Sequence, residues 1–311
     1  MSRFLTCVEI CAGAGGQALG LALAGFKHEA VVELEPEYCE VLKSNRPDWP
    51  VICTDVRGFS GKAYFGVDLF AGGVPCPPFS VAGKQMGPED ERDLFPQALR
   101  LIGEIKPKAV MLENVRGFLD KKFEGYRQHL FASIESMGYR VYMQVLHASD
   151  FGVPQLRPRV AIVALRDDVV GKFSFPKGIG IEPPTVGECL LDLMAENGWK
   201  QASMWAKQAN TIAPTLVGGS KKHGGPDLGP TRAKKAWALL GVDGNGVANT
   251  APDCDFEGMP RLTARMMARL QGFADSWDFG SKKTAACRMI GNAFPPAVSR
   301  AVGVKIKEQL Q

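Results

Sequence analysis

The sequence contains few of the residues that build metal sites or disulfide frameworks. It has four histidines, and its eight cysteines form no C-x-x-C pair, so we expect reduced intracellular thiols and no metal site. No segment approaches the ~18 uninterrupted apolar residues of a membrane span. The N-terminus also lacks a basic region followed by a long apolar stretch. We therefore expect no signal peptide, no contact with a membrane and a cytoplasmic location.

A strong excess of charge is missing as well. The net charge is only +4 and the pI is about 8.6, which permits a nucleic-acid partner without arguing for one. Hydrophobic residues make up 45% of the 311 residues and charged residues 23%. These values are typical of a globular protein with one or two domains.

Residues 1–165 alternate short apolar runs with helical patterns, which predicts βαβ units and a parallel sheet. Strands are expected at 5–10, 30–34, 51–53, 67–70, 109–112, 140–146 and 160–165, and helices at 17–24, 38–45, 94–105 and 124–137. From 170 to 260 the periodicity is weak and Gly, Pro and Lys interrupt the chain, so we expect a smaller, irregular second domain. Two further helices are expected at 263–270 and 297–309.

Two of the expected strands lead to residues with reactive or hydrogen-bonding side chains. One leads through Gly-Gly to Pro75 and Cys76, and another delivers Glu113 and Asn114. In open α/β sheets, reactive groups lie just beyond the carboxyl ends of strands. A thiol and a carboxyl at one rim of a sheet suggest covalent catalysis with an acid partner.

The loop between the first strand and the first helix contains Gly13, Gly15 and Gly16. Glycines let the backbone approach a ligand, and helix-start amides favour an acceptor-rich group. Glu33 ends the second strand, where an acid can hold ribose hydroxyls, and Asp55 ends the third, where it can accept from an adenine amino group. Each acid could instead be a solvated helix cap. A G-x-x-x-x-G-K-[ST] loop does not occur, so the three strand ends favour an adenosyl ligand other than ATP.

With these residues in place, the chain resembles a C5-cytosine DNA methyltransferase of the bacterial restriction–modification type over nearly its full length. The matching motifs, in the family's order, are the glycine loop at 13–16, VELEPEYCEVL, Asp55-Val56, GGVPCPPFSVAGKQ, MLENV, Gln155-Leu-Arg-Pro-Arg159, Arg261-Leu-Thr-x-Arg265 with Arg269-Leu-Gln-Gly-Phe273, and Gly291-Asn292. Two positions depart from the family. Cys11 stands where a phenylalanine commonly packs on the cofactor, and Pro77 follows Cys76 where many members have glutamine.

The resemblance implies an α/β fold, with a Rossmann-like S-adenosylmethionine-dependent methyltransferase sheet and a smaller target-recognition domain. The implied domains are a catalytic and cofactor-binding domain at 1–169, a target-recognition domain at 170–260, and a segment at 261–311 that returns to the catalytic domain. Glu33 would contact the ribose and Leu34 the adenine face. The residues implied to hold S-adenosylmethionine are Ile10, Cys11, Ala12, Gly13, Gly15, Gly16, Glu33, Leu34, Asp55, Val56, Gly73, Pro75 and Asn292.

The implied reaction transfers a methyl group to C5 of a cytosine that has been flipped out of a specific short duplex sequence. Cys76 would add to C6, and Glu113 would hydrogen-bond the ring N3 and amino group. Arg157 and Arg159 are candidates to stabilise the thiolate. The residues expected to bind substrate come from a lid at 80–93, the Glu113 strand, a Thr-Leu element and a basic glycine-rich run: Ser80, Lys84, Gln85, Arg92, Asn114, Thr215, Lys221, Lys222 and Arg232.

Other functions remain open at this point. The tRNA-directed branch of the family shares every catalytic motif, although the glycine- and lysine-rich region at 170–260 favours a DNA reader. Intact Cys76, Glu113 and Arg159 argue against a catalytically silent DNA-binding relative. A small-molecule methyltransferase needs neither lid nor reader. The implied partners are double-stranded DNA and a cognate restriction endonuclease acting on the same site, with the enzyme itself a monomer.

Overall fold

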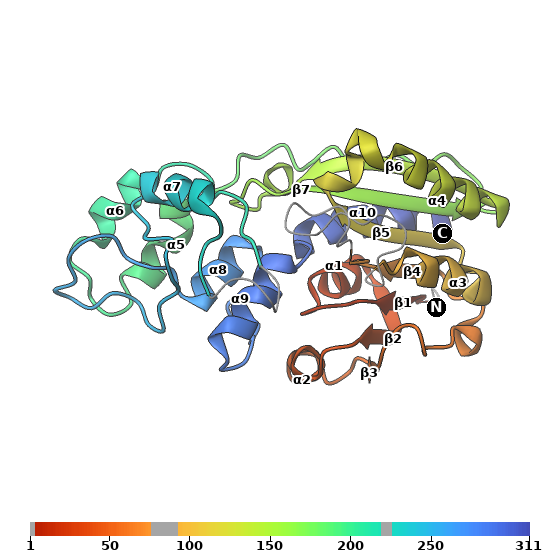
Figure 1. Cartoon of the computed structure of the whole chain (residues 1–311), viewed down its shortest axis with the longest axis horizontal. Coiled ribbons are helices and arrows are strands. Elements are labelled where there is room, and N and C mark those ends of the chain that lie inside the picture. The colour runs from red at the N-terminus through yellow and green to blue at the C-terminus, as the bar shows by residue number, and fades with distance from the viewer. Residues whose placement is uncertain (1–3, 76–92, 219–225) are drawn as a thin grey trace. The chain divides into compact units, whose positions relative to one another are not determined.

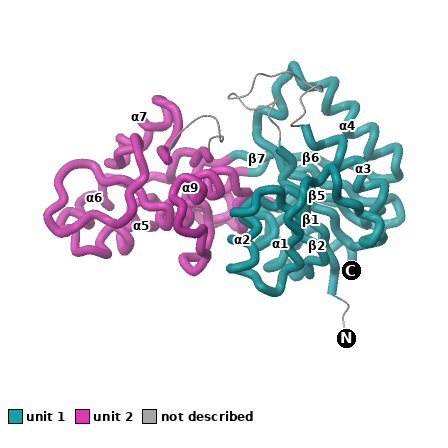
Figure 2. The backbone as a smooth tube through the Cα atoms, turned by 60° about the horizontal axis from the view of Figure 1, so that its bottom comes forward, with its two compact units in different colours: residues 1–146, 158–176, 298–311 teal, residues 147–157, 177–297 magenta. Residues whose placement is uncertain are grey.

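The computed structural model describes residues 4–75, 93–218 and 226–311, and Figure 1 shows their helices and strands. The chain forms two compact units (Figure 2). Unit 1 contains residues 1–146, 158–176 and 298–311, and unit 2 contains residues 147–157 and 177–297. This division splits the C-terminal segment 261–311 at residue 298. The functional roles expected for 1–169, 170–260 and 261–311 remain predictions.

Unit 1 is built on a seven-stranded sheet with the order β3-β2-β1-β4-β5-β7-β6. Its strands are β1 (Leu5–Ile10), β2 (Phe26–Glu33), β3 (Val51–Cys53), β4 (Leu69–Gly72), β5 (Ala109–Val115), β6 (Tyr139–His147) and β7 (Pro158–Arg166). Strands β3, β2, β1, β4 and β5 pair in parallel, whereas β7 runs antiparallel to β5. Because only residues 148–157 separate β6 from β7, there is no room for the helical crossover of a parallel pair. The sheet is therefore mixed, and the expectation of a parallel sheet is corrected at this edge.

Helices cover both faces of the sheet in unit 1 (Figure 1). On one face, α3 (Phe95–Ile105) and α4 (Glu124–Ser136) bury apolar side chains against β1, β2, β4, β5 and β7. On the other, α1 (Gly16–Ala24) lies against α10 (Pro296–Leu310), where a Cβ on Gly303 would come within 2.9 Å of the Ala24 methyl. Helix α2 (Pro36–Asn45) packs beside β3. Since both faces are covered, only the strand ends remain for a ligand.

Unit 2 is more helical than its weak periodicity indicates. It contains α5 (Val186–Met194), α6 (Ala202–Gln208), α7 (Thr231–Leu239), α8 (Ala264–Leu270) and α9 (Lys283–Asn292). Of these helices only α8 was expected, at 263–270, and Thr263 proves to be its N-cap. The irregular region at 170–260 is corrected to one that includes three short helices. Helix α5 begins at a capping box, in which Thr185 and Glu188 bond each other's backbone amides. That Thr-x-x-Glu spacing is the sequence signal that could have revealed it.

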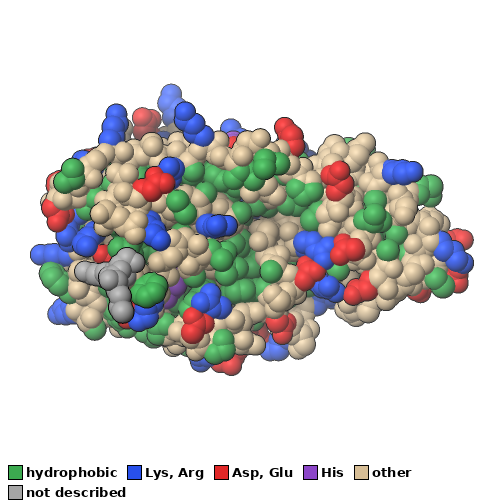
Figure 3. Space-filling model, turned by 180° about the vertical axis from the view of Figure 1, so that it is seen from behind, with side chains coloured by type: hydrophobic (Ala, Val, Ile, Leu, Met, Phe, Trp, Pro, Cys, Tyr) green, Lys and Arg blue, Asp and Glu red, His purple; other side chains and the backbone are tan. Residues whose placement is uncertain are grey.

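The described residues form no membrane-spanning helix and no metal-binding cluster, and charges of both signs are mixed on the face shown in Figure 3. Within these ranges, no helix is long and apolar enough to cross a membrane. The same residues hold no group of His, Cys, Asp and Glu able to bind a metal ion. On the face shown in Figure 3, basic and acidic side chains are interspersed, in keeping with a net charge of only +4. Contacts to a polyanion must therefore depend on local groups.

Candidate active site

Glu113 lies near the carboxyl end of β5, and β5 is the sheet neighbour of β4, the strand that precedes Cys76 in the chain. Gly73 follows β4, and a Cβ there would lie 3.6 Å from Glu113 Oε2 and 3.7 Å from the Cys11 carbonyl oxygen. The structure thus brings together the start of the glycine loop after β1, the segment that leads to Cys76, and the Glu113 carboxyl. The sequence analysis expected the Cys76 segment and Glu113 at one rim of the sheet because both follow expected strands.

Glu113 forms an ion pair with Arg159, which enters from the antiparallel strand β7. The distance between Arg159 Nε and Glu113 Oε1 is 2.8 Å, and both side chains are 11% exposed. Burial lowers the pKa of Arg159, and the adjacent carboxylate opposes that shift. A pair buried this deeply holds both side chains in a fixed direction. The arrangement places one hydrogen-bonding carboxyl and one guanidinium at the same strand ends.

Asn114 connects β5 to the segment that carries the expected nucleophile. Its side-chain amide donates to the Val74 carbonyl oxygen at 3.4 Å, and its own oxygen accepts from the Val115 amide at 2.8 Å. Asn114 is 2% exposed, so its buried side chain ties the end of β4 to the end of β5. Pro75 is exposed immediately after this tie. Cys76 lies outside the described residues.

The loop after β1 has the backbone geometry that its glycines predict. Gly13 has φ +57° and Gly15, the residue before α1, has φ +85°. These left-handed values favour glycine. Cys11 also has a positive φ, of +52°, which is uncommon for a residue with a side chain. Burial raises the pKa of its thiol, and the carboxylates of Glu33 and Asp55 add to the effect.

Glu33 is held against this loop. Its Oε2 accepts from the Gly13 amide at 2.8 Å and its Oε1 from the Glu35 amide at 2.9 Å. Burial raises the pKa of Glu33, while these amides oppose the shift. Leu34, the next residue, is 54% exposed although it is apolar. An exposed leucine beside a fixed carboxylate is suited to the face and hydroxyls of a nucleoside.

Asp55 lies two residues beyond β3 and bonds Arg57 through both oxygens. Its Oδ1 accepts from the Arg57 amide and its Oδ2 from the guanidinium, each at 2.9 Å. The Arg57 amide and then its guanidinium lower the pKa of Asp55, so the group is an anionic acceptor. Arg57 was not singled out from the sequence, although its spacing from Asp55 in a turn is a signal of such a pair. Around the loop, Ile10, Ala12 and Val56 are buried, and Gly16 begins α1.

Arg157 and Arg159, only two residues apart, have different surroundings. Arg157 is fully buried in unit 2. Its Nη1 donates to the Leu216 carbonyl oxygen at 2.8 Å, and its Nη2 donates to those of Gly291 and Ala293 at 2.7 and 2.8 Å. These partners support a structural role for Arg157, whereas its expected catalytic role remains a prediction.

Two buried glutamines complete this network, and the sequence did not single out their structural role. Gln155 accepts from the Leu216 amide at 2.8 Å and donates to Gln271 at 2.7 Å. Gln271 in turn donates to the Ala293 carbonyl oxygen at 2.6 Å. Both belong to recognised motifs, QLRPR and RLQGF. In the sequence, only the presence of both motifs could have indicated the hydrogen bond between Gln155 and Gln271.

Asn292 ends α9 in unit 2, close to the start of the basic run. A Cβ on Gly218 would come within 2.5 Å of Asn292 Oδ1 and of the Arg288 carbonyl oxygen, so glycine is required for this approach. Thr215, three residues earlier, donates its hydroxyl to the Leu156 carbonyl oxygen. The segment from Thr215 to Gly218 is thereby fixed within unit 2. The cofactor contact expected for Asn292 remains a prediction.

The remaining DNA-binding expectations fall largely on residues the structure does not describe. Ser80, Lys84, Gln85, Arg92, Lys221 and Lys222 lie outside the described residues. Arg232 and Lys235 are exposed on α7. Lys234, on the same helix, forms an ion pair with Asp227 at 2.9 Å, which reduces its value as a phosphate contact.

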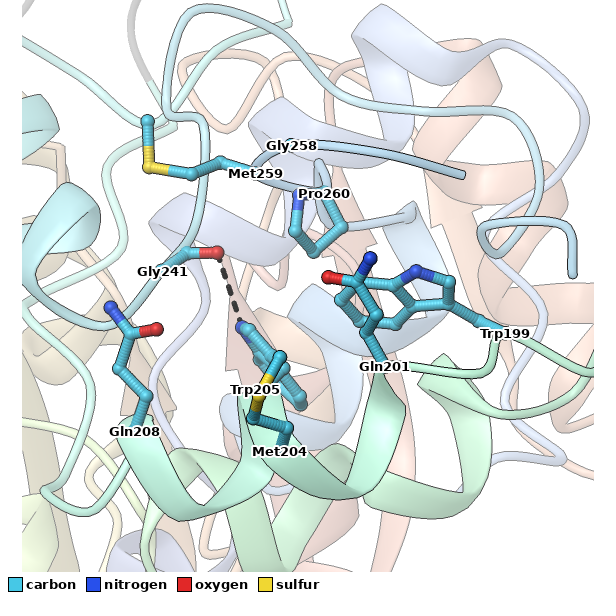
Figure 4. A pocket seen from close by; sticks show the side chains of 9 residues that line it. All are labelled: Trp199, Gln201, Met204, Trp205, Gln208, Gly241, Gly258, Met259 and Pro260. Carbon is cyan, nitrogen blue, oxygen red and sulfur yellow. Dashed lines mark hydrogen bonds between the residues drawn. The ribbon is translucent and has the colours of Figure 1, made fainter. Parts of the chain in front are cut away.

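A pocket in unit 2 carries no catalytic group (Figure 4). Its volume is about 80 Å³, enough for a few water molecules. Trp205, from α6, donates its indole N–H to the Gly241 carbonyl oxygen across the pocket at 3.2 Å. The lining residues are Trp199, Gln201, Met204, Trp205, Gln208, Gly241, Gly258, Met259 and Pro260. With no acid, base or nucleophile among them, this pocket is not the site of the reaction.

The sheet order, the glycine loop after β1 and the carboxyl end of β5 define a Rossmann-like methyltransferase fold. The same fold occurs in the Schizosaccharomyces pombe Dnmt2 methyltransferase. The TM-score is 0.69 at 17% identity, with 98% of this chain and 99% of that chain covered. This likeness confirms the fold class expected from the sequence.

The chain belongs to the C-5 cytosine-specific DNA methylase family, whose model matches residues 5–308, and it is a DNA cytosine-5-methyltransferase. It is 54% identical to the type II methyltransferase M.NaeI of Lentzea aerocolonigenes over 98% of this chain and 75% of that protein. It is 53% identical to the type II methyltransferase M.NgoMIV of Neisseria gonorrhoeae over 98% of both chains. The expected resemblance and the expected enzyme class are thereby confirmed.

Proposed function

We propose that this enzyme methylates C5 of a flipped-out cytosine in a specific short sequence of duplex DNA, through a covalent bond between Cys76 and C6. The buried Glu113–Arg159 pair carries this proposal, because it lies at the strand ends beside the segment that leads to Cys76. The family and the fold both indicate S-adenosylmethionine as the methyl donor.

The two members of the pair have complementary tasks. Glu113 hydrogen-bonds the N3 and amino-group edge of the cytosine, and in its protonated form it donates to N3 as negative charge builds on the ring. Arg159 holds Glu113 in place and, as a cation, stabilises nearby anionic groups, including the Cys76 thiolate. A thiolate that adds to C6 makes C5 electron-rich enough to accept a methyl group. Loss of the C5 proton then expels the Cys76 thiolate from C6 and restores the ring. The base must leave the duplex to reach these groups.

The covalent step can be tested by trapping it. Duplex DNA with 5-fluorocytosine at the target position should form a stable adduct with the enzyme in the presence of S-adenosylmethionine, since fluorine cannot leave as the C5 proton does. Peptide mapping should place the adduct on Cys76. The variant Cys76→Ser should form none, and Cys254→Ser, which changes an exposed cysteine of unit 2, should react as the wild type does. An adduct on another cysteine, or an active enzyme without an adduct, would contradict the proposal.

The residues at the carboxyl ends of β1, β2 and β3 fit an adenosyl group. When bound, S-adenosylmethionine supplies an electrophilic methyl group. Glu33, fixed by the Gly13 and Glu35 amides, is suited to accept from ribose hydroxyls, and the anionic Asp55 is suited to accept from the adenine amino group. The exposed Leu34 offers an apolar face for the ring.

Glu33→Ala and Asp55→Ala should each raise the dissociation constant of S-adenosylmethionine by about 10- to 100-fold, as expected for a lost hydrogen bond to a charged group. Calorimetry with purified protein measures this directly. Glu40→Ala is the matched control, because Glu40 is an exposed acid on α2 that pairs with Lys43 at 3.3 Å. Unchanged binding in both test variants would show that the loop does not hold the cofactor.

Sequence reading is assigned to the region 170–260. Exposed Arg232 and Lys235 on α7 are suited to phosphate contacts, as are Lys221 and Lys222. Type II relatives that cover 98% of this chain support a restriction–modification role, with a cognate endonuclease acting on the same site and a monomeric methyltransferase. Methylation of duplex DNA but not of tRNA separates this proposal from the tRNA-directed branch.

A further inference from the structure

Two cysteines beside the cofactor loop serve no step of the proposed reaction. Cys39 lies in the first turns of α2 and is 1% exposed. Cys53 is the last residue of β3 and is exposed. Both are free thiols. They flank the β2–α2 turn that contains Glu33 and Leu34.

The two thiols converge on successive carbonyl groups of that turn. Cys39 donates its S–H to the Glu33 carbonyl oxygen at 3.5 Å, and Cys53 donates to the Leu34 carbonyl oxygen at 3.9 Å. Cys53 is also the register partner of Glu33 in the parallel pair of β2 and β3. Since Glu33 and Leu34 are consecutive residues, the two thiols lie at neighbouring positions of one turn.

We propose that Cys39 and Cys53 form a redox-sensitive dithiol, which a hydroperoxide closes to a disulfide and which thereby weakens binding of the adenosyl cofactor. The proposal rests on the proposed function in one respect, namely that Glu33 and Leu34 hold the cofactor. The modification site itself depends only on the positions of the two sulfurs.

The reaction balances with hydrogen peroxide as the two-electron oxidant. The exposed Cys53 sulfur takes one oxygen as the O–O bond breaks, which gives a sulfenic acid and one water. The Cys39 sulfur then attacks the Cys53 sulfur, and the displaced hydroxide leaves with the Cys39 proton as a second water. Two thiols are oxidised and one peroxide is reduced. Cys53 is exposed and Cys39 is buried, so Cys53 is the sulfur that meets the oxidant first.

Closure of the disulfide alters the turn that positions Glu33. A disulfide has no S–H to donate, so the Glu33 and Leu34 carbonyl groups both lose a hydrogen bond. The sulfurs must also approach to about 2.05 Å, which draws the start of α2 toward β3. The Glu33 carboxylate depends on this turn, because one of its oxygens bonds the Glu35 amide and the other the Gly13 amide.

The experiment compares reduced protein, peroxide-treated protein and treated protein reduced again with dithiothreitol, all at full length. Non-reducing peptide mapping should find a linked pair of peptides containing Cys39 and Cys53. The dissociation constant of S-adenosylmethionine, measured by calorimetry, should rise about tenfold, equivalent to ~1.4 kcal/mol, and return after reduction. Binding is the chosen readout because oxidation of Cys76 would also abolish activity.

Cys53→Ser should bind the cofactor normally and lose the response to peroxide. Cys254→Ser removes another exposed thiol and should respond as the wild type does. The absence of a linked peptide, linkage with an unchanged dissociation constant, or a full response in Cys53→Ser would each overturn the proposal. Reduced protein that binds no S-adenosylmethionine would instead overturn the proposed function, which the reduced sample tests by itself.

Discussion

Replacing Glu113 by glutamine should lower the single-turnover rate of methyl transfer by about 10²–10⁴-fold, with little change in affinity for S-adenosylmethionine. Glutamine keeps the shape of the side chain but cannot pass a proton to the ring as charge develops. The structure supports a localised effect, since Glu113 lies at the end of β5 with its Oε1 on Arg159 and its Oε2 toward Gly73.

The measurement combines rapid-quench kinetics on duplex DNA with calorimetry for the cofactor. Glu135→Gln, which changes an exposed acid on α4, is the matched control and should match the wild type. Because Glu113→Gln also removes the charge beside a buried arginine, its melting temperature must be recorded, and the rate compared well below it. A stable variant with a near-wild-type rate would remove Glu113 from the mechanism.

The strand ends of unit 1 could be predicted because each depends on local sequence. The run before Glu33 and the run before Glu113 are buried on both faces, and such strands are continuous apolar segments in the sequence. Gly13 and Gly15 of the loop have the positive φ values that glycine favours. Parallel strands present their carboxyl ends at one edge of the sheet. Cys11, Gly73 and Glu113 therefore lie close together because β1, β4 and β5 are parallel neighbours.

Unit 2 was harder to predict for a physical reason. Its helices are short, and their stability comes from contacts that periodicity does not reveal. A Cβ on Gly187 would overlap the backbone of Ala206, so α5 and α6 approach at a glycine that looks like a helix breaker. Likewise, the bonds from Gln155 to Gln271 join residues 116 positions apart. Long-range polar contacts of this kind leave no spacing signal.

The two arginines in QLRPR show most clearly that sequence spacing does not reveal long-range contacts. They also give the second prediction with a large expected effect. Sequence alone treats Arg157 and Arg159 as equivalent cations. The structure directs Arg159 to a carboxylate in unit 1 and Arg157 to backbone carbonyl groups in unit 2. Replacing Arg157 should therefore lower mainly the stability of the protein, whereas replacing Arg159 should lower mainly the rate of methyl transfer.

Arg157→Met should destabilise the protein by about 3–5 kcal/mol, because the buried carbonyl groups of Leu216 and Gly291 lose the Arg157 donor and that of Ala293 keeps only its bond from Gln271. For a chain of this kind, that corresponds to a fall in melting temperature of roughly 10 °C. Scanning calorimetry measures it. Arg232→Met, at an exposed position on α7, is the control and should melt with the wild type.

Arg159→Met should show the opposite balance, with a large loss of methyl-transfer rate at temperatures where the variant remains folded. Its guanidinium pairs with Glu113, so its removal frees the carboxyl on which the proposed proton donation depends. If Arg157→Met instead kept its melting temperature and lost only its rate, Arg157 would be a catalytic residue, and its bonds to Leu216, Gly291 and Ala293 would be incidental. If both variants lost stability alone, the buried pair would be structural and Glu113 would act without help from either arginine.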